Sequence, residues 1–374
     1  MKPKAVFISN KIYLDSNSAK GGAGICTQEY IDLLSTRFDL FLFSVTNRKS
    51  FIYRILARLG LNIYSDFDYC DYQDDLELLI NEKQIGFVFL NQANTAVFGA
   101  GIKSLCGNNI SVILCSHGNE SGDLLHDFTR HKETQPKFKQ LLNNWILGKT
   151  LVTEVKHRNG AFDGVITVSE VEVQIENWLG ARKVLLMPRT IKYRNSDFNE
   201  TLGVVGFVGD LSHPPNYSGL KLVCEELSKM DKANEIELRI VSSSKNEGLM
   251  LEAEFLFVKY LGYLTDNEIF DESRSWSFFL NPVFYYSRGV STKLAWALGL
   301  GIPVITTEIG KRGYVWTNGE LPLVKTPCEM ASVICHYSRD IKKIYFYREQ
   351  VVEIVNSGPN MDDLSLKLKE FLYK

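Results

Sequence analysis

The stretch GVSTKLAWALGLGIPVITT, residues 289–307, contains the signals of a helix and a strand in close succession. Its part KLAWALGLG (293–301) has apolar residues at helical spacing. The part PVITT (303–307) is a short β-branched run of the kind that forms a buried strand. Another strand-like run, WSFFLNPV (276–283), comes just before this stretch. Strand, helix and strand in this order predict a βαβ unit with parallel strands.

The same alternation extends outward over the whole chain in two series. Strand-like runs of the first series are AVFISN (5–10), FDLFLFSV (38–45), IGFVFLN (85–91), SVILCSHG (111–118), GVITVS (164–169) and KVLLMP (183–188). The second series adds GVVGFVGD (203–210), IELRIVSS (236–243) and FLFVKYLGYL (255–264). The polar segment KYRNSDFNE (192–200) separates the two series and reads as a linker.

These series predict an α/β protein with two Rossmann-like, doubly wound domains that face each other across a cleft. A chain of 374 residues is long enough for two domains. We expect residues 1–190 to form the first domain and residues 201–345 the second. Residues 346–374 are expected to form a C-terminal helix that crosses back to the first domain.

Net charge, the cysteine pattern and the length of the apolar runs disfavour several classes of protein. The formal net charge of -2 disfavours a nucleic-acid partner. The seven cysteines are odd in number and lack a CxxC pair, which disfavours a disulfide framework or a zinc site. No run resembles a signal peptide or a transmembrane span. The chain is therefore expected to be cytoplasmic, with peripheral contact to the inner membrane face left open. The run FIYRILARLGLNIY (51–64) is either an amphipathic surface for such contact or an internal helix.

Ligands of parallel sheets bind at the carboxyl ends of the strands, which points to five loops. They are residues 10–24, 116–122, 209–216, 262–266 and 281–293. In the first loop, Gly21 and Gly22 would let the backbone approach a phosphate at the start of a helix. The same glycines would also suit a tight turn without a ligand.

The last of these loops has the composition of a diphosphate site. Arg288, Gly289, Ser291, Thr292 and Lys293 precede an apolar helix. Arg and Lys bind phosphate well, and the hydroxyl of Ser291 or Thr292 is expected to cap the helix. The alternative is a solvated helix start with ordinary surface cations.

Seven strings resemble, in order, those of GT-B glycosyltransferases of the family-four kind. They are GGAGICTQEY (21–30), CSHGNES (115–121), FDGVITVSEVE (162–172), MPRTI (187–191), VGFVGDLSHPPNYSG (205–219), LGYLTD (261–266) and GVSTKLAWALGLGIPVITTEIGKRG (289–313). The resemblance covers nearly the whole chain. It implies an enzyme of class EC 2.4 that moves a sugar from a nucleoside-diphosphate sugar to an acceptor hydroxyl. Most relatives of this kind retain the anomeric configuration, and polysaccharide or glycoconjugate synthesis is the process that the resemblance implies.

The resemblance also implies roles for individual residues. His117 is expected near the donor sugar and the acceptor, and Asn119 and Glu120 either orient the acceptor or structure their loop. Contacts to the donor nucleotide are expected from Gly209, Asp210, Tyr263 and Leu264, with Tyr263 stacking on the base. The departing diphosphate would be stabilised by two cations and by backbone N–H groups. The cations are Arg288 and Lys293, and the N–H groups are those near Ser291 and Thr292 and in the Gly21–Gly22 loop. No Asp-x-Asp follows a strand, so we expect no metal and no other cofactor.

One departure from the family pattern leaves other functions open. Relatives usually carry two glutamates around the last string, and Arg288 and Trp296 occupy those positions here. Neither side chain accepts hydrogen bonds as a carboxylate does. Trp296 either packs beside the ribose or fills the core. A catalytically impaired GT-B scaffold or partner subunit is therefore one alternative, and a GT-B sugar-nucleotide epimerase is another.

Overall fold

A computed structural model describes residues 2–15, 21–47, 51, 55–56, 59, 61, 64, 66–130, 135–194, 197–286 and 288–373. Most of the run 51–64, expected as an amphipathic or internal helix, lies outside the described residues. The chain forms two compact units. The first comprises Met1–Pro188, Ser287–Gly289 and Asn360–Lys374, and the second comprises Arg189–Tyr286 and Val290–Pro359.

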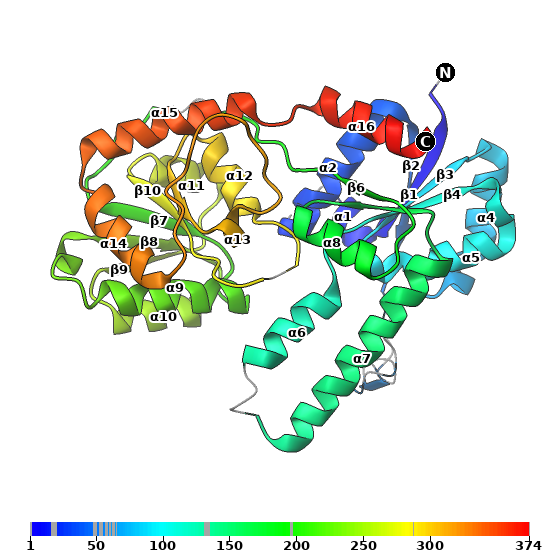
Figure 1. The fold of residues 1–374 in the computed structure, drawn as a ribbon, viewed down its shortest axis with the longest axis horizontal. Helices are drawn as coiled ribbons and strands as arrows, with labels where there is room; N and C mark the ends of the chain where they lie inside the picture. Colours follow the sequence, from blue (N-terminus) through cyan, green and yellow to red (C-terminus); the bar gives the residue numbers. More distant parts are fainter. Residues whose placement is uncertain are drawn as a thin grey trace. The chain divides into compact units, whose positions relative to one another are not determined.

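The first unit contains a six-stranded sheet in the order β2-β1-β3-β4-β5-β6, and every pairing is parallel (Figure 1). The strands are β1 (Lys4–Asn10), β2 (Asp39–Val45), β3 (Phe87–Asn91), β4 (Ser111–Cys115), β5 (Gly164–Thr167) and β6 (Val184–Leu186). Ile8 of β1 lies opposite Phe43 of β2 and Leu90 of β3. Strands β1, β3, β4 and β5 are almost entirely buried, as expected for parallel strands that are covered on both faces.

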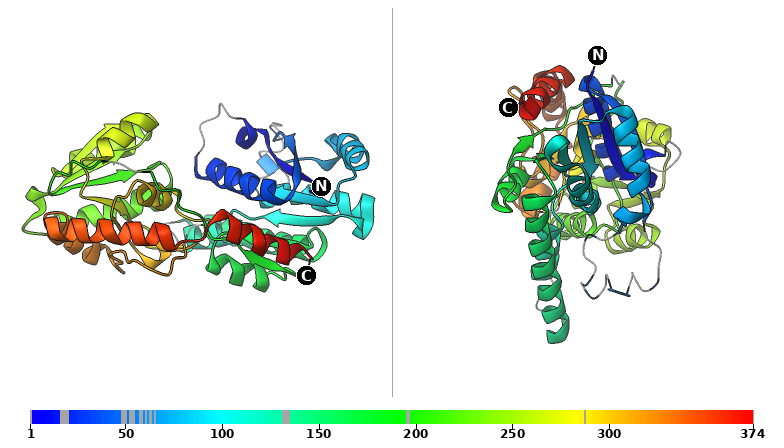
Figure 2. Two further views of the ribbon diagram at one scale, coloured as in Figure 1. Left: turned by 90° about the horizontal axis from the view of Figure 1, so that it is seen from above. Right: turned by 90° about the vertical axis from the view of Figure 1, so that its right-hand side faces the viewer.

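Helices cover both faces of this sheet. Figure 2 shows α2 on one side of it and the green helices on the other. The helices whose bounds the structure describes in this unit are α1 (Lys11–Leu14), α2 (Gly22–Arg37), α4 (Gln73–Lys83), α5 (Ala96–Cys106), α6 (Glu120–Arg130), α7 (Lys137–Gly160), α8 (Glu170–Trp178) and α16 (Met361–Tyr373). Three short 3₁₀ turns lie at Tyr69–Asp71, Ala93–Thr95 and Gly107–Asn109.

The second unit contains a five-stranded parallel sheet in the order β11-β10-β7-β8-β9. Its strands are β7 (Val204–Val208), β8 (Glu237–Val241), β9 (Val258–Gly262), β10 (Phe278–Asn281) and β11 (Val304–Thr306). Its helices are α9 (Pro214–Leu227), α10 (Lys245–Glu254), α11 (Asp266–Ser273), α12 (Thr292–Gly299), α13 (Glu308–Lys311), α14 (Pro327–Tyr337) and α15 (Ile341–Ser357), with a 3₁₀ turn at Ala233–Glu235.

Two hydrophobic clusters lie on opposite faces of this second sheet. Val205, Phe278 and Leu280 belong to one cluster, together with residues of α9, α10 and α14. Their strand neighbours Val204 and Phe279 belong to the other cluster, together with residues of α12 and α15. Successive strand residues thus point into different cores, which accounts for the continuous apolar runs in the sequence. The predicted α/β class with two Rossmann-like sheets is confirmed.

The single C-terminal helix expected over 346–374 is wrong as one element. Helix α15 ends at Ser357 and α16 begins at Met361. Gly358, Pro359 and Asn360 separate them, and a proline disfavours helical backbone at the residue before it. Helix α15 belongs to the second unit and α16 to the first. None of the helices that the structure describes is long and apolar enough to cross a bilayer.

Candidate functional site

The carboxyl ends of β1, β3 and β4 bring together polar residues of the first unit. His117 follows β4 and is half-buried. Its Nε2 lies 2.8 Å from Oδ1 of Asn91, the last residue of β3. Its ring also lies 5.7 Å from the ring of Tyr30, whose hydroxyl donates to the carbonyl of Ser116. His117 is thus anchored on two sides at the edge where parallel sheets bind ligands.

The hydrogen bonds around Asn91 determine where the proton of a neutral His117 lies. The hydroxyl of Thr27 donates to the carbonyl of Ala23, and that of Ser9 donates to the carbonyl of Asn10. Both hydroxyl oxygens therefore accept from Nδ2 of Asn91, at 2.9 and 2.8 Å. This leaves Oδ1 of Asn91 as the acceptor for His117, whose Nε2 must then carry the hydrogen.

Gln92 completes this environment with a strained backbone. Its φ is 71° and its ψ is 156°, a region that residues other than glycine rarely occupy. Its Nε2 lies 3.4 Å from Nδ1 of His117. Backbone strain of this kind is found most often at functional sites. Neither Asn91 nor Gln92 was identified from the sequence as a site residue. Both lie at the carboxyl end of β3, beside the predicted loop 116–122 that contains His117.

The predicted glycine loop is shorter than expected. Helix α2 begins at Gly22, so Gly22, Ala23 and Gly24 form its first turn and only Gly21 lies outside as the N-cap. A Cβ added at Gly21 would meet no atom within 4 Å, so packing does not require a glycine there. The expected backbone loop is thus wrong in extent, but free N–H groups of a helix N-terminus remain at this position.

Asn119 is buried and supports the structural alternative for its loop. Its Nδ2 donates to Oε1 of Glu176 at 3.1 Å. Glu176 in turn accepts two hydrogen bonds from the guanidinium of Arg158, and both side chains are fully buried. Asn119 has no exposed surface in this arrangement, which favours the loop-structuring alternative, and a role in orienting the acceptor stays a prediction.

Glu120 belongs to an acidic group that binds Arg288. Nη1 of Arg288 lies 2.8 Å from Glu120, and Nε lies 3.1 Å from Asp123. The backbone N–H of Arg288 also donates to Asp123, and that of Gly289 donates to Glu172 at 2.8 Å. All of these residues belong to the first unit. The guanidinium expected to bind diphosphate is therefore neutralised by carboxylates here.

In the second unit, the loop after β7 places Asp210 among hydroxyl groups. Oδ1 of Asp210 accepts from the hydroxyls of Ser244 and Ser212, at 2.6 and 2.7 Å, and from the N–H of Ser212. The bond from Ser244, followed by those from Ser212, lowers the pKa of this carboxyl. The adjacent Gly209 lies close to Lys293, because a Cβ there would be 3.1 Å from the lysine side chain.

Lys293 lies in the first turn of α12, with its ammonium group partly buried. Nζ is 2.5 Å from Oδ1 of Asn216 and lies over the Phe207 ring at 5.4 Å from its centroid. Burial lowers its pKa from 10.5 to about 8, and the charge of Asp210 opposes this shift only in part. Lys293, Gly209 and Asp210 are thus brought together in one unit, while Arg288 groups with the other.

The N-terminus of α12 differs in one detail from the prediction. Ser291 occupies the N-cap position, but its side chain makes no capping bond. Its hydroxyl instead donates to Oδ1 of Asn281 at 2.9 Å, because β10 ends beside it. The expected cap by Ser291 is therefore wrong. Thr292 is the first helical residue, and the N–H groups of this first turn have no acceptor within the helix.

The other two nucleotide positions follow β9. Tyr263 is largely exposed, whereas Leu264 packs partly against the core of the second unit. Thr265 then starts α11 with a capping box that includes Glu268. The backbone at Tyr263 and Leu264 is thus held between a strand and a capped helix. Their contact with a base stays a prediction.

Trp296 is half-buried at the edge of the core of the second unit. It packs against that core, with its ring centroid 5.8 Å from Phe279 and 6.4 Å from Trp276. This arrangement favours the packing alternative over a place beside the ribose. Among the described residues, no group of His, Cys, Asp and Glu is arranged to hold a metal ion.

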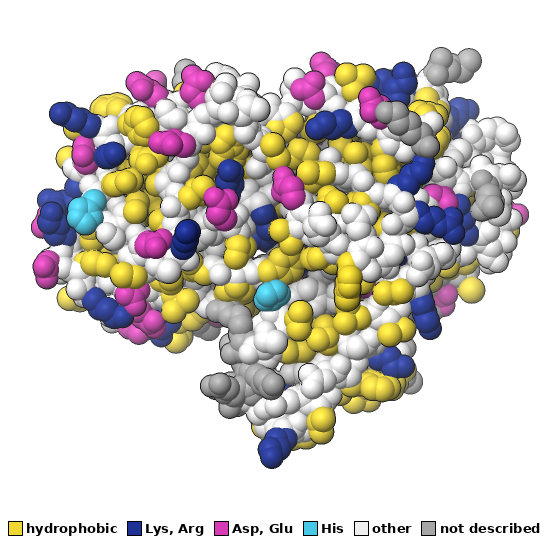
Figure 3. Space-filling model, viewed as in Figure 1, with side chains coloured by type: hydrophobic (Ala, Val, Ile, Leu, Met, Phe, Trp, Pro, Cys, Tyr) yellow, Lys and Arg dark blue, Asp and Glu magenta, His cyan; other side chains and the backbone are white. Residues whose placement is uncertain are grey.

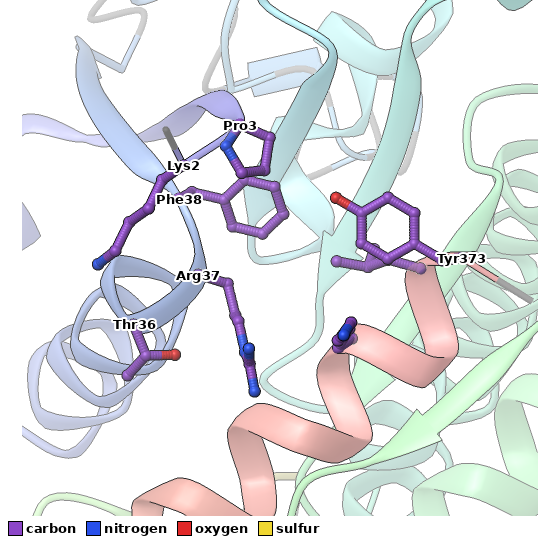
Figure 4. A pocket seen from close by; sticks show the side chains of 8 residues that line it. Lys2, Pro3, Thr36, Arg37, Phe38 and Tyr373 are labelled. Carbon is purple, nitrogen blue, oxygen red and sulfur yellow. The ribbon is translucent and has the colours of Figure 1, made fainter.

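A cavity of ≈ 370 Å³ lies elsewhere in the first unit (Figure 4). Lys2 and Pro3, just before β1, line it together with Phe38, just before β2, and with Tyr373 of α16. These positions mark the amino ends of the strands. The cavity therefore lies at the opposite edge of the sheet from His117 and does not belong to the candidate site.

Solved structures similar to the whole chain define its fold. Sucrose-phosphate synthase from Thermosynechococcus elongatus matches with a TM-score of 0.68 and 13% identity, over 99% of this chain and 98% of that one. HepE from Anabaena in complex with UDP and glucose matches with a TM-score of 0.62 and 15% identity, over 99% of both chains. The lipopolysaccharide outer core galactosyltransferase WaaB matches with a TM-score of 0.55 and 14% identity, over 98% of this chain and 95% of that one. The fold is the GT-B fold.

Sequence comparison adds a family match for part of the chain. Residues 203–340 match the model of the family described as glycosyl transferases group 1. None of the curated proteins matches this chain at a significant level. Over these residues, most of the second unit, the chain resembles the group 1 glycosyltransferases, enzymes of class EC 2.4 that transfer a sugar from a nucleotide sugar. The predicted resemblance and enzyme class are confirmed.

Proposed function

We propose that the second unit binds the diphosphate of a nucleoside-diphosphate sugar through Lys293 and the first-turn N–H groups of α12. The observation that carries this proposal is the environment of Lys293. Its ammonium group is desolvated at a helix N-terminus, and a neutral amide is its nearest oxygen partner. An anion placed there would restore the interactions that burial removes, and it would meet the positive end of the helix dipole.

The same groups provide a reason to expect catalysis without a metal ion. Negative charge grows on the diphosphate as it leaves the sugar, and preorganised cations and N–H groups stabilise that charge. Lys293 and the N–H groups at Thr292 supply both kinds of group. Chelation by EDTA is therefore expected to leave the rate of transfer unchanged, and a loss of activity that Mg²⁺ restores would contradict this part of the proposal.

For the first unit, we propose that His117 contacts the reacting sugar or the acceptor. Its Nε2 donates to Asn91, so the edge of the ring that carries Nδ1, near Gln92, is the one that would face the substrate.

The transfer is proposed to retain the anomeric configuration, which NMR of the first-formed product would decide. Relatives of this fold include a lipopolysaccharide galactosyltransferase, which supports a saccharide acceptor in glycoconjugate synthesis. All seven cysteines are free thiols, which fits a cytoplasmic site of action.

The direct test of the donor proposal is nucleotide binding by calorimetry. UDP and UDP-glucose are the first ligands to test, because HepE has been solved with both. Lys293→Ala should weaken binding roughly tenfold to a hundredfold, since it removes a charge-assisted contact. Lys342→Ala is the matched control, because Lys342 is an exposed lysine on α15 of the same unit.

Two results would contradict the proposal. If the wild type binds a nucleotide and Lys293→Ala binds it equally well, Lys293 is not a phosphate ligand. If uridine, guanosine and adenosine diphosphates all fail to bind or to raise the melting temperature at millimolar concentration, the second unit is not a donor site. A ligand at a hundred times its Kd would stabilise the fold by about 2.7 kcal/mol, which is readily measured.

A further inference from the structure

Helix α7 of the first unit turns polar side chains inward. Its buried residues are Asn143, Thr150, Glu154 and Arg158. At about 100° per residue, these four lie within an arc of about 80°. Arg158 binds Glu176, and Glu154 accepts from the hydroxyls of Tyr64 and Ser121. The helix is therefore held to its unit by polar interactions along this arc.

The opposite side of α7 carries apolar side chains that are exposed to solvent. Phe138 and Leu141 are 73% and 70% exposed, and Trp145, Val152 and Val155 are exposed as well. Their spacings of three, four, seven and three residues place them on one stripe, centred about 150° from the centre of the buried arc. We call these five residues the outward stripe. A surface helix normally has the reverse arrangement, so the stripe needs a partner.

Basic side chains accompany the outward stripe. Lys137, Lys139, Lys149 and Lys156 of α7 are all exposed, and the only acidic residue of this helix, Glu154, is buried. Nζ of Lys149 lies over the ring of Trp145, 4.7 Å from its centroid. Figure 3 shows hydrophobic side chains along the projection that α7 forms in Figure 1, with basic side chains among them.

The charges decide between the two kinds of partner that an apolar stripe could take. A second copy of this helix would bring lysines against lysines, and like charges at such a seam repel. A bilayer with anionic headgroups offers apolar depth for the stripe and negative charge for the lysines, whose stems can extend to the headgroups. We infer that the outward stripe of α7 docks the first unit on an anionic lipid surface.

This docking lies on a segment that the sequence did not single out. The run 51–64 was the candidate for membrane contact, with an internal helix as its alternative, and it lies mostly outside the described residues. In α7, Trp145 and Phe138 would sit at the level of the headgroups and upper acyl chains, where aromatic rings are favoured. The helix would lie in the plane of the interface and would not cross it, in keeping with its length and lysine content.

Sedimentation with lipid vesicles tests the proposal on the full chain. The wild type should bind vesicles of phosphatidylcholine with 30% phosphatidylglycerol and should bind pure phosphatidylcholine at least about tenfold more weakly. Phe138→Ser with Trp145→Ser should reduce binding by about tenfold or more, because it removes inserted aromatic surface. Changing Lys137, Lys149 and Lys156 to Gln should reduce it on the order of a hundredfold, and 0.5 M salt should weaken the wild type similarly.

Trp178→Ser is the matched control, because Trp178 is 73% exposed on α8 of the same unit and lies outside the stripe. Since all the changed side chains are exposed, unchanged circular dichroism and melting temperature are expected for every variant. Equal binding to neutral and anionic vesicles, or unchanged binding by the Phe138/Trp145 variant, would overturn the proposal. Absence of vesicle binding together with a dimer that the same variant disrupts would assign the stripe to a second copy instead. These readouts do not depend on sugar transfer.

Discussion

The ammonium group of Lys293 should make nucleotide binding depend on pH in a defined direction. Its pKa is lowered to about 8 by burial, so the free protein loses this charge above pH 8. A bound diphosphate favours the protonated form. Affinity is therefore expected to be constant from pH 6.5 to 7.5 and to fall by up to about tenfold per pH unit above pH 8. Calorimetric Kd values across pH 6.5–9.5 would measure this.

Lys293→Arg serves as the control for that profile. A guanidinium stays protonated throughout this range, so the decline above pH 8 should disappear even if the absolute affinity changes. A wild-type affinity that stays constant up to pH 9.5 would show that Lys293 is not the group whose charge binds the ligand.

Gln92 should show opposite effects on stability and on activity. Its φ of 71° and ψ of 156° are costly for glutamine and natural for glycine. Gln92→Gly is expected to leave the free energy of unfolding unchanged or to raise it by about 1–2 kcal/mol, after the entropic cost of glycine is included. It should also lower kcat about tenfold or more, because the amide beside Nδ1 of His117 is lost. Urea unfolding and steady-state kinetics measure the two effects.

Gln84 provides a matched position for this comparison. It has a φ of 56° at the end of α4 and is exposed. Gln84→Gly should raise stability by up to about 1 kcal/mol with no change in kcat. If Gln92→Gly instead destabilises the fold while kcat stays at the wild-type level, the strain at Gln92 has only a structural role.

At this scale the sequence predicts residue types better than their partners. His117 was assigned from the family resemblance, and Lys293 from the basic, glycine and hydroxyl residues that precede an apolar helix. Asn91 was missed because its partners, Ser9 and Thr27, come from segments far away in the chain. Ser291 or Thr292 was expected to cap α12, but the hydroxyl of Ser291 donates to Asn281 of the neighbouring strand instead. Such competition between partners depends on tertiary geometry, which no local pattern contains.

At the scale of elements, the strands were predictable and the helices around α7 were not. Parallel strands buried on both faces leave continuous apolar runs, which is why all eleven strands of the two sheets fall within or overlap the predicted runs. Helix α7 gives no clear signal, since it is held by buried polar residues and exposes apolar ones. An outward-facing pattern of this kind cannot be recognised until the buried side of the helix is known.

The buried pair Arg158–Glu176 should be essential for holding α7 in place. Arg158 donates to both carboxylate oxygens of Glu176, at 2.8 and 2.7 Å, and neither side chain is exposed. Arg158→Met would leave the carboxylates of Glu176 and Glu154 buried without their cation. The free energy of unfolding should fall by about 3–5 kcal/mol, as measured by urea denaturation.

Two further variants distinguish the cost of leaving a carboxylate buried without its cation from the cost of losing the contacts of Arg158. Arg158→Met combined with Glu176→Leu should recover much of the loss, because no unpaired carboxylate then remains at position 176. Lys221→Ala, which breaks an exposed pair with Glu254, should cost about 1 kcal/mol or less. If Arg158→Met costs no more than Lys221→Ala, the pair does not stabilise α7.

At the scale of the whole molecule, the chain order and the compact units do not coincide. The second unit ends with α15, yet the last helix, α16, belongs to the first unit. There Arg37 of α2 donates to Ser365, and Leu368 is fully buried. The sequence predicted one C-terminal helix over 346–374 that crosses back to the first domain, and this range takes in the last part of α15 as well as α16. Each helix was recognisable, whereas the surface on which each one packs was not.

Removing α16 should therefore destabilise one unit and spare the other. A chain that ends at Pro359 exposes the apolar surface that Leu368 and its neighbours cover, whereas all residues of the second unit remain. Two thermal transitions are expected, with that of the first unit lowered by at least about 5 °C, since the loss of one buried leucine alone costs about 2–5 kcal/mol. Nucleotide should still raise the other transition, because its proposed ligand Lys293 lies in the second unit. Leu368→Ala in the full chain should reproduce the lowered transition in milder form.

A truncated chain that melts in a single transition at the wild-type temperature would show that α16 does not stabilise the first unit. Loss of nucleotide binding in the truncated chain would show that the second unit does not bind its ligand independently of α16.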